Sequence, residues 1–508
     1  MTKTFLFVNE NIFTFNSGTE FSAMNRQKLF KENKRSSKIV TRNYNQGLHQ
    51  EIEKYGLDSD DVLNMYDYFQ NVTDVPHKHA FLRYSDMVDK NEYKIDGVDN
   101  NKSYIEQKGK VVAQVNIFPL TVGEIGTVDY YDRFGNTSSR DVWDGRGFRS
   151  KTQYLHPDGQ VGHEILFDYK GNAVMEITHM NINGQVHPTM FKLLNYKGHN
   201  RRFNTEDELF EFFLNEISDP KTTVLINDRP TLTEVVARVK NVAARYQFLH
   251  NEQTTDANLA GSAKGKLYPI LETLFHKHLP DYDGLIVSTP QQRDDLSRLF
   301  PEIKTYAIFD TALFNDQEEK IRESLSDDRD NNVVYVGRIF HDKHIDQLLQ
   351  IVSFAKNRVP NIHLDVVGYF ESEEYRQELL ELAKKLGLET NVDFKGYLVG
   401  KDKEAVLSQA KVMVQTSFGE GLSMSLVNGL EYGLAEVAYD VNYGPRNIID
   451  NDVNGYLIPA GNVREAASHI DDILLDNKLF KKLSNGSLVK AKEFSSENVN
   501  KQWDQIDK

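Results

Sequence analysis

The sequence contains no cysteine at any of its 508 positions. Disulfide bonds, thiolate metal sites and cysteine nucleophiles are therefore excluded, as expected for a protein of a reducing compartment. No run of about 18 apolar residues occurs, so no membrane-spanning helix is predicted. The opening MTKTFLFVNENIF lacks a long apolar core and a small-residue cleavage site, and it predicts a first strand instead of a signal peptide. We expect a cytoplasmic protein.

Basic residues are in the minority, because 60 Lys and Arg face 75 Asp and Glu and give a formal net charge of -15. This balance argues against a nucleic-acid partner. The exception is the basic stretch, residues 25–42 (NRQKLFKENKRSSKIVTR). It predicts either a solvated helix face followed by a strand, which we favour slightly, or a patch for a phosphate-rich substrate or for peripheral contact with the inner face of the cell membrane.

The length allows two or three domains. Residues 1–94 open as strand, glycine turn, helix and strand, and strands alternate with helices again over 205–315, where YPILETLFHKHLPDY (268–282) predicts one helix. Strands that alternate with helices favour a parallel sheet. We therefore predict one Rossmann-like domain from these two segments.

Residues 95–204 alternate apolar and polar positions between turns that recur every 12 to 14 residues. Glycine supplies the positive φ angle that tight hairpin turns need, and the turn glycines are Gly135, Gly147, Gly159, Gly171, Gly184 and Gly198. This period predicts an inserted antiparallel β-meander. A large open sheet has exposed edges, so we expect the meander to be covered, paired or used in assembly, and we consider an inert decoration less favoured.

A charged linker, NDQEEKIRESLSDDRDNN, leads into a second run of strands and helices. We predict that residues 316–490 form a second doubly wound domain and that residues 491–508 form a helix crossing back to the first domain. Two such domains face each other across a cleft at the carboxyl ends of their strands, where ligands bind.

Two motifs carry candidate chemistry. VGRIFHDKHID places Arg338 and Lys343 after a strand, and these two cations suit a diphosphate. TSFGEGLSMSLVNG places Glu420 in a loop where a carboxylate can accept hydrogen bonds from sugar hydroxyls. From Gly421 onward the backbone amides are expected to begin a helix whose N-terminus receives phosphate. Alternatively, Glu420 only complements the helix dipole.

The whole chain resembles the retaining GT-B glycosyltransferases of family four, in particular the bacterial branch that glycosylates wall teichoic acid (poly(glycerol phosphate) or poly(ribitol phosphate)) or serine-rich surface proteins. SGTEFSAMNRQKLF, GLDSDDVLNMYDYFQ, GRIFHDKHID, EGLSMSLVNG and AYDVNYGPRNIIDNDVNGYLI carry the resemblance, together with the meander. It implies an α/β GT-B fold with two facing Rossmann-like domains. The first (1–94 and 205–315) would lie on the acceptor side and the second (316–490) would bind the donor, while the inserted meander (95–204) would bind the acceptor or serve in oligomerisation.

The resemblance also implies roles for single residues. Arg338, Lys343, Glu420 and His250 would be catalytic, with His250 beside the sugar on the acceptor side. The other donor-binding residues would be Gly18, Thr19, Gly337, Gly421, Leu422, Ser423 and Asn428, with Gly18 near the donor phosphates. No metal and no cofactor are expected, because cations and helix N-termini serve the diphosphate. The leaving phosphate would help to deprotonate the acceptor.

The sequence departs from the family pattern at five places. Asn428 stands where a second glutamate would hold the ribose, Ser423 replaces a glycine, Leu434 follows Gly433, Tyr369-Phe370 follows Gly368, and Gln253 replaces a second histidine. Asn428 lacks the charge, a loss of roughly 1–3 kcal/mol in hydrogen bonding, and Glu431 is a candidate to substitute in part.

Three hypotheses follow. In the first, the protein transfers glucose or N-acetylglucosamine from UDP-glucose or UDP-N-acetylglucosamine to teichoic acid or serine-rich protein, as a homo-oligomer or in a hetero-complex with a paralogous glycosyltransferase. In the second, it is a catalytically degenerate partner of an active enzyme. In the third, which we rank lowest, it is a GT-B epimerase.

Overall fold

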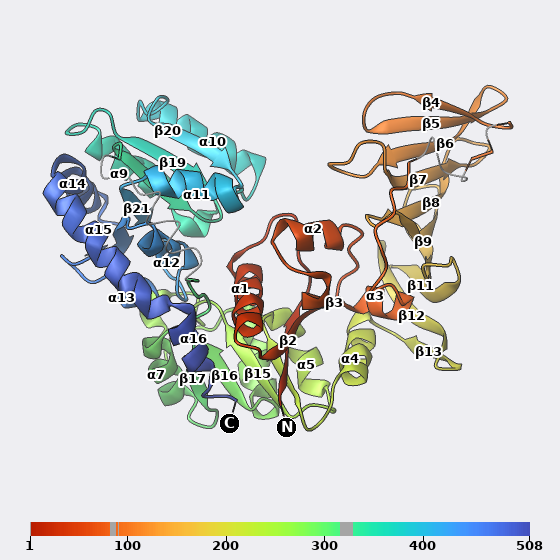
Figure 1. Ribbon diagram of the computed structural model, residues 1–508, viewed down its shortest axis with the longest axis horizontal. Coiled ribbons are helices and arrows are strands. Elements are labelled where there is room, and N and C mark those ends of the chain that lie inside the picture. Colours follow the sequence, from red (N-terminus) through yellow and green to blue (C-terminus); the bar gives the residue numbers. More distant parts are fainter. Residues whose placement is uncertain (1, 82–87, 90, 315–328, 508) are drawn as a thin grey trace.

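The computed structural model describes residues 2–81, 88–89, 91–314 and 329–507, so most of the predicted linker lies outside the described residues. The strands form three sheets. Two are parallel, and the third is an antiparallel arm that rises from one side of the first (Figure 1). Among the described residues, no helix combines the length and the apolar character needed to cross a membrane.

The first sheet has seven parallel strands in the order β17-β16-β15-β14-β1-β2-β3. They are β1 (Thr4–Asn9), β2 (Ser36–Thr41), β3 (Val62–Asn64), β14 (Thr223–Asn227), β15 (Ala244–Leu249), β16 (Gly284–Val287) and β17 (Thr305–Ala307). The helices of this half are α1 (Gly18–Glu32), α2 (Leu48–Lys54), α3 (Met65–Gln70), α4 (Glu206–Ile217), α5 (Thr233–Arg238), α6 (Pro269–Thr273) and α7 (Pro290–Leu299). Helices on both faces bury the sheet, which is why β1 and β14 are almost continuously apolar.

One helix prediction was wrong in its extent. Residues 268–282 form α6, then a π-helical turn (Leu274–His278) and a 3-10 turn (Leu279–Asp281). Pro280 lies in the last turn, and a proline there cannot donate the backbone hydrogen bond of a continuing helix. The apolar side chains of this segment are nevertheless buried in the first domain's core.

The meander forms one ten-stranded antiparallel sheet in simple sequence order. Its strands are β4 (Lys94–Gly97), β5 (Lys102–Gln107), β6 (Lys110–Ile117), β7 (Ile125–Tyr131), β8 (Thr137–Asp144), β9 (Phe148–Leu155), β10 (Val161–Phe167), β11 (Ala173–Ile182), β12 (Gln185–Tyr196) and β13 (His199–Phe203). All six predicted turn glycines have φ between +83° and +88°. The predicted turns are therefore confirmed, because L-residues with a side chain rarely adopt this conformation.

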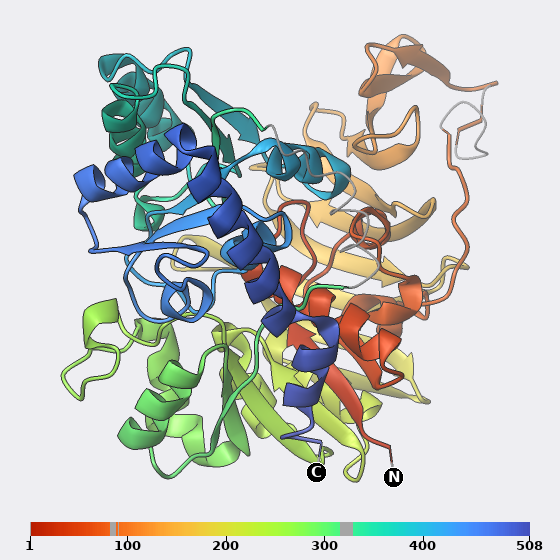
Figure 2. The ribbon, with the colours of Figure 1, turned by 60° about the vertical axis from the view of Figure 1, so that its left-hand side comes forward.

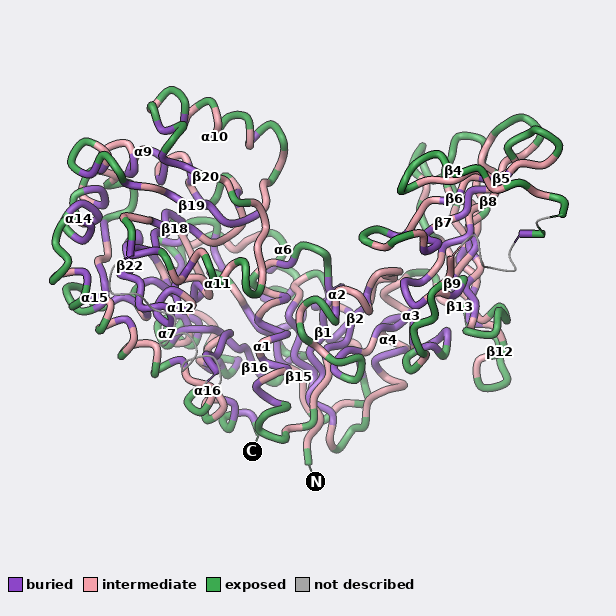
Figure 3. Tube along the Cα trace, turned by 45° about the horizontal axis from the view of Figure 1, so that its top comes forward, coloured by how far each residue is buried: buried purple, intermediate pink, exposed green. Residues whose placement is uncertain are grey.

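The meander is anchored at one end. Apolar side chains of β10, β11 and β12 belong to the same buried cluster as α3 and α4, whereas β5, β6 and β7 have a small cluster of their own. The buried residues of the arm therefore fall into two separate clusters, one at its base and one farther out (Figure 3). The core of the first domain thus extends into the base of the meander.

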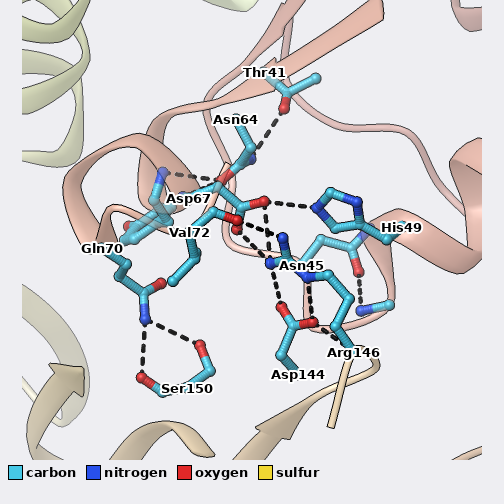
Figure 4. Close-up of polar contacts among 12 residues, drawn as sticks. Thr41, Asn45, His49, Asn64, Asp67, Gln70, Val72, Asp144, Arg146 and Ser150 are labelled. Carbon is cyan, nitrogen blue, oxygen red and sulfur yellow. Dashed lines mark hydrogen bonds and ion pairs between the residues drawn. The ribbon is translucent and has the colours of Figure 1, made fainter. Parts of the chain in front are cut away.

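A buried polar network also joins the meander to the first domain (Figure 4). Arg146, in the β8–β9 turn, donates to both carboxylate oxygens of Asp67 at 3.2 Å and to Asp144. His49 contacts Asp67 at 2.8 Å, and Gln70 donates to the carbonyl of Ser150 at 2.9 Å. Buried charges need such partners, so this network fixes the arm's base in one orientation.

The second parallel sheet has the order β20-β19-β18-β21-β22-β23. Its strands are β18 (Asn332–Val336), β19 (His363–Val367), β20 (Val392–Gly396), β21 (Val412–Gln415), β22 (Ala435–Tyr439) and β23 (Gly455–Ile458). Its helices are α9 (Ile345–Ala355), α10 (Glu373–Lys385), α11 (Gly400–Gln409), α12 (Met424–Glu431), α13 (Pro445–Ile448), α14 (Val463–Leu475) and α15 (Asn477–Ala491).

The chain returns to the first domain at its C-terminal end. Helix α16 (Ser496–Trp503) follows α15 and lies beside α1 (Figure 2). Its Trp503 packs edge-on against Phe30 and Phe248 in the first domain's core. The two parallel sheets are thus linked twice by the chain, and the domain limits assigned from the sequence stay a prediction.

Candidate active site

A cavity of about 660 Å³ lies between the two parallel sheets, at the carboxyl ends of their strands. This is where open α/β sheets bind their ligands. The predicted site residues that line it are Gly18, Thr19, His250, Gly337, Arg338, Lys343, Glu420, Ser423 and Asn428. The other two do not line it, because Leu422 is fully buried in the core around α12 and Gly421 faces a neighbouring loop.

Lys343 and Glu420 form a buried ion pair in the cavity wall, with 2.7 Å between Nζ and Oε1. Burial alone would lower the pKa of Lys343, but the carboxylates of Glu420 and Asp342 outweigh it and keep the pKa above its usual value. The ammonium is therefore charged at neutral pH. An anionic donor in the cavity would compete with the Glu420 carboxylate for the Lys343 ammonium.

Gln415, at the end of β21, holds the donor loop together. Its amide nitrogen donates to Glu420 Oε1 at 2.7 Å, and its amide oxygen accepts from Ser423 Oγ at 2.5 Å. Ser423 has φ +76°, the left-handed region that favours glycine. The loop therefore keeps a glycine-like backbone in spite of the substitution, and the bond from Ser423 to Gln415 offsets part of the strain.

The expected helix start at Gly421 was wrong by three residues. Helix α12 begins at Met424, with Ser423 as its N-cap. The Gly421 amide instead donates to Asn251 Oδ1 at 3.0 Å, and a Cβ at Gly421 would lie 2.1 Å from the carbonyl oxygen of His250. The left-handed turn at Ser423 breaks the helix there, so Gly421 serves the close approach of two loops across the cleft.

Two helix N-termini face each other in the cavity. Gly18 and Thr19 are the first residues of α1, and a Cβ on Gly18 would lie 3.9 Å from Met424 Sδ at the start of α12. The N-cap of α1 is held by a capping box between Ser17 and Glu20. Both termini carry the positive end of a helix dipole, so the space between them suits an anion.

Arg338 extends from the loop after β18, with a side chain that is 35% exposed. Its guanidinium lies over the ring of Phe340, 4.6 Å from the ring centre, and 3.6 Å from Asp342. The Tyr335 hydroxyl donates to the Arg338 carbonyl at 2.8 Å and fills the space where a side chain at Gly337 would lie. The backbone is fixed while the guanidinium remains accessible to a ligand.

His250 lines the cavity with a side chain that is 11% exposed, and both of its ring nitrogens face carboxylates. Its Nε2 lies 2.9 Å from Asp228 Oδ1, its Nδ1 lies 3.8 Å from Asp310 Oδ2, and Arg26 donates to both oxygens of Asp228. Burial would lower the pKa of His250, but the two carboxylates outweigh it and raise the pKa. A raised pKa favours the imidazolium, a form that suits His250 to stabilise negative charge instead of acting as a general base.

Asn428 lies beside a lysine that the sequence motifs did not reveal. Lys403 Nζ donates to Asn428 Oδ1 at 3.3 Å. Burial lowers the pKa of Lys403, against the opposing effect of the Glu431 and Glu404 carboxylates. Lys403, Asn428 and Glu431 all line the cavity, so a ribose at this end would meet an amide, a cation and a carboxylate.

Glu252 lies behind the donor loop. The Tyr268 hydroxyl donates to its Oε1 at 3.1 Å, and a Cβ at Gly419 would lie 2.5 Å from the same oxygen. Burial first, and then the charge of Glu420, raise the pKa of Glu252 to about 7. The Glu252 carboxyl group, which lies near Glu420, therefore titrates near neutral pH.

Aromatic residues bridge the two halves of the cleft. Tyr397, after β20, accepts from the Asn16 amide at 3.0 Å and exchanges a 3.0 Å hydrogen bond with the Tyr55 hydroxyl. Phe15 packs against Tyr397 and Tyr369, the latter at one of the atypical positions. The substitution Gln253 is instead structural, because its amide donates to the carbonyl of Ala260 inside the first domain.

The basic stretch is mostly paired within the protein. Salt bridges join Arg26 to Asp228, Lys28 to Glu32, Lys31 to Asp58 and Asp61, Arg35 to Asp504 and Asp507, and Arg42 to Glu10, Glu206 and Asp207. These contacts explain the stretch by internal pairing. They give no support to a track for a phosphate-rich polymer or a membrane surface.

The sequence motifs missed several residues of the site, most of which line the cavity themselves. Gln415 directly precedes TSFGEG and Asn251 directly follows His250, so their places beside known motifs were a usable signal. Lys403, Asp228 and Asp310 lie outside the motifs used to predict the site. They reach the cavity through pairings that the fold alone establishes.

Part of the chain matches a known protein family. Residues 316–487 match the family model described as "Glycosyl transferases group 1". This part of the chain is a glycosyltransferase domain. It contains Arg338, Lys343, Glu420 and Asn428, the residues that surround the second half of the cavity.

The similarity extends over the full chain at the level of fold. A poly(ribitol-phosphate) alpha-N-acetylglucosaminyltransferase of Staphylococcus aureus is 24% identical over 99% of both chains. The crystal structure of the pneumococcal O-GlcNAc transferase GtfA in complex with UDP and GlcNAc aligns with a TM-score of 0.84 at 19% identity, over 100% of this chain and 98% of that one. A crystal structure of a GtfA/B complex aligns with a TM-score of 0.77 at 18% identity, over 99% of both chains. The predicted GT-B fold is confirmed, and the chain is a glycosyltransferase of this architecture.

Proposed function

We propose that the protein is an active retaining glycosyltransferase that moves glucose or N-acetylglucosamine from a UDP-sugar to hydroxyl groups of a teichoic acid or a serine-rich protein. The observation that carries the proposal is the Lys343–Glu420 pair, which lies in one cavity with Arg338 and two facing helix N-termini. These groups match the parts of a sugar nucleotide: cations and amides for the diphosphate, and a carboxylate for sugar hydroxyls.

The proposed role of the cations is to stabilise the leaving group. As the bond between the sugar and the diphosphate breaks, negative charge grows on the phosphate oxygens, and Arg338 and Lys343 are fixed before the reaction begins. Fixed charges in a partly buried site lower such a barrier more than mobile water does. In this proposal the two cations and the amides of α1 and α12 serve the diphosphate without a metal ion.

His250 supports the same chemistry from the acceptor side. Because Asp228 and Asp310 favour its protonated form by raising its pKa, it is assigned to charge stabilisation near the sugar. This assignment fits a mechanism in which an oxygen of the leaving phosphate accepts the proton of the acceptor hydroxyl. The donor and acceptor then react on the same face of the sugar, which retains the anomeric configuration.

The acceptor alternatives come from the similar proteins. The Staphylococcus aureus relative is named for poly(ribitol phosphate), and GtfA is a protein O-GlcNAc transferase. The meander is the surface that we assign to acceptor binding, or to assembly as a homo-oligomer or with a paralogous chain as in the GtfA/B complex. Its edge strands β4 and β13 offer unpaired backbone groups for either purpose.

The test is calorimetric titration of the purified chain with UDP, UDP-glucose and UDP-N-acetylglucosamine in chelator-treated buffer. The proposal expects Kd values on the order of micromolar and a preference for one sugar. Transfer is then followed by NMR of the anomeric proton with poly(ribitol phosphate), poly(glycerol phosphate) and a serine-rich peptide as separate acceptors. No nucleotide binding at millimolar concentration would overturn the proposal.

Asn428 favours a second candidate, a catalytically degenerate partner that binds acceptor or stabilises an active glycosyltransferase. Here Asn428 meets Lys403 at the position where a charged carboxylate would hold the ribose. This candidate expects weak nucleotide binding and no transfer by the isolated chain. Turnover of a UDP-sugar by the isolated chain would rule it out.

A further inference from the structure

Two histidines and a glutamate meet at the outer part of the meander, away from the cleft. His77 and His79 lie on the segment that leads from α3 to the sheet, and Glu124 directly precedes β7. Phe81 pairs with Glu124 as an antiparallel bridge, and the Ile125 amide donates to the carbonyl of Ala80 at 3.0 Å. Alternate residues of an extended segment point to the same side, so both imidazoles reach the Glu124 carboxylate.

The three side chains have the spacing of a metal site. His79 Nδ1 contacts Glu124 Oε1, and His77 Nε2 lies 3.7 Å from Glu124 Oε2. The imidazole centres are 4.5 Å apart, and one ligand atom from each residue lies within 4.8 Å of the others. Zn²⁺ binds His nitrogen and carboxylate oxygen at about 2.0–2.2 Å, so tetrahedral ligand atoms lie about 3.3 Å apart. Small side-chain rotations would close the site.

We propose that His77, His79 and Glu124 bind a divalent transition-metal ion, with Zn²⁺ as the preferred occupant. Two imidazoles select zinc and its neighbours over Mg²⁺ and Ca²⁺, which take oxygen ligands. The carboxylate is 10% exposed, whereas the imidazoles are 46% and 63% exposed. The site therefore has a fixed buried ligand, two accessible ones and a fourth position open to water.

The position of this site, beside the β8–β9 turn, would give the metal a structural role. The Lys78 amide, between the two histidines, donates to the carbonyl of Arg146 at 2.8 Å. A Cβ at Gly147 would lie 1.6 Å from the Lys78 carbonyl, so the segment passes against the β8–β9 turn. Arg146 is the centre of the network that anchors the meander (Figure 4). A metal at Glu124 would fasten the same segment to β7 and extend that anchor along the arm.

A second group of potential ligands, His363, Asp365 and Asp393, lies in the donor domain. Lys395 Nζ already contacts Asp365 at 3.2 Å and Asp393 at 2.9 Å, so a cation occupies the place between these carboxylates. Glu124 is contacted by imidazoles instead, which are themselves metal ligands. The meander group is therefore the stronger candidate, and the donor-domain group supplies an internal control.

The experiment uses the full-length chain without a polyhistidine tag, stripped with a chelating resin and titrated with Zn²⁺ alone by calorimetry and by competition with a chromophoric chelator. The sequence has no cysteine, so no thiolate can contribute. The proposal expects one Zn²⁺ per chain with a Kd of about 1 μM or tighter. His77→Gln and His79→Gln should each weaken binding by about 10- to 100-fold, an effect typical of the loss of groups that hold a metal.

His363→Gln and His199→Gln, the latter an exposed histidine in β13, should leave Zn²⁺ binding unchanged. Thermal unfolding of each variant, compared with that of the original chain, checks that the chain is folded. Unchanged affinity in both His77→Gln and His79→Gln, loss of binding in His363→Gln, or no binding by the original chain would each overturn the proposal. Because the metal lies outside the cleft, the result does not depend on whether the chain transfers sugar.

Discussion

Lys343 and Glu420 are 77 positions apart in the sequence, yet their side chains lie 2.7 Å apart in the cleft. Gln415 donates to the same Glu420 oxygen, so the carboxylate is held from two sides. The lysine that would neutralise a diphosphate is thus already neutralising a carboxylate that would bind the sugar. In the proposed function, a bound donor would satisfy both groups and would thereby couple recognition of the phosphate to recognition of the sugar.

Lys343→Ala is expected to lower kcat by about 10²- to 10³-fold, the range found when one fixed group that stabilises transition-state charge is removed. The variant also leaves Glu420 buried without its cation. The measurement is single-turnover transfer from the preferred UDP-sugar. Lys395→Ala, which removes a partly exposed lysine paired with Asp393 in the same domain, is the matched control and should retain activity. Similar rates for both variants would disprove the assigned role of Lys343.

Asn428→Glu is expected to tighten UDP binding by roughly 10-fold, which corresponds to about 1.4 kcal/mol. A carboxylate at 428 can accept charge-assisted hydrogen bonds from the ribose hydroxyls, and Lys403 is close enough to balance its charge. Calorimetry with UDP measures the change. Asn428→Gln adds the same length without the charge and should give no gain. An unchanged or weaker affinity in the glutamate variant would mean that the nucleotide does not use this position.

Ser423→Ala is expected to be less stable than Ser423→Gly by about 1 kcal/mol. Both variants lose the hydrogen bond to Gln415, but alanine keeps the left-handed strain at φ +76°, which costs roughly 1–2 kcal/mol for a residue with a side chain. Thermal unfolding of the two variants in the same buffer measures the difference. If alanine were as stable as glycine, the loop would have to adopt another backbone conformation in solution.

Local requirements explain what the sequence could predict. A hairpin turn needs a positive φ angle within a few residues, so the period from Gly135 to Gly198 predicted the meander turns correctly. Arg338, Lys343 and Glu420 belong to motifs next to strand ends, and the fold brings strand ends together by construction. These features depend on residues that are close in the sequence, so the sequence alone was enough to predict them.

Long-range pairings explain what the sequence could not predict. Arg26 was read as part of a basic stretch, but it binds Asp228 from 202 positions away and thereby holds His250 in place. The Gly421 amide is turned toward Asn251, 170 positions away, and not toward a ligand. Asp228 is not marked by spacing or composition, and Asn251 is marked only by its place after His250, so the assembled cleft is needed to identify these two pairings.

Glu252 should make the stability of the protein depend on pH. Its pKa is about 7 in the folded chain, chiefly through burial, against about 4.3 when unfolded. The folded state therefore binds more protons between these values, and stability falls as the pH rises through this window.

Glu252→Gln removes the titration. The free energy of unfolding of the variant, relative to that of the original chain, should therefore rise by about 2–3 kcal/mol from pH 5 to pH 8. Thermal unfolding at several pH values measures the gain, and Glu374→Gln on the exposed face of α10 is the control. Parallel pH profiles for Glu252→Gln and the original chain would show that Glu252 is already ionised at pH 5 and that its pKa is not raised.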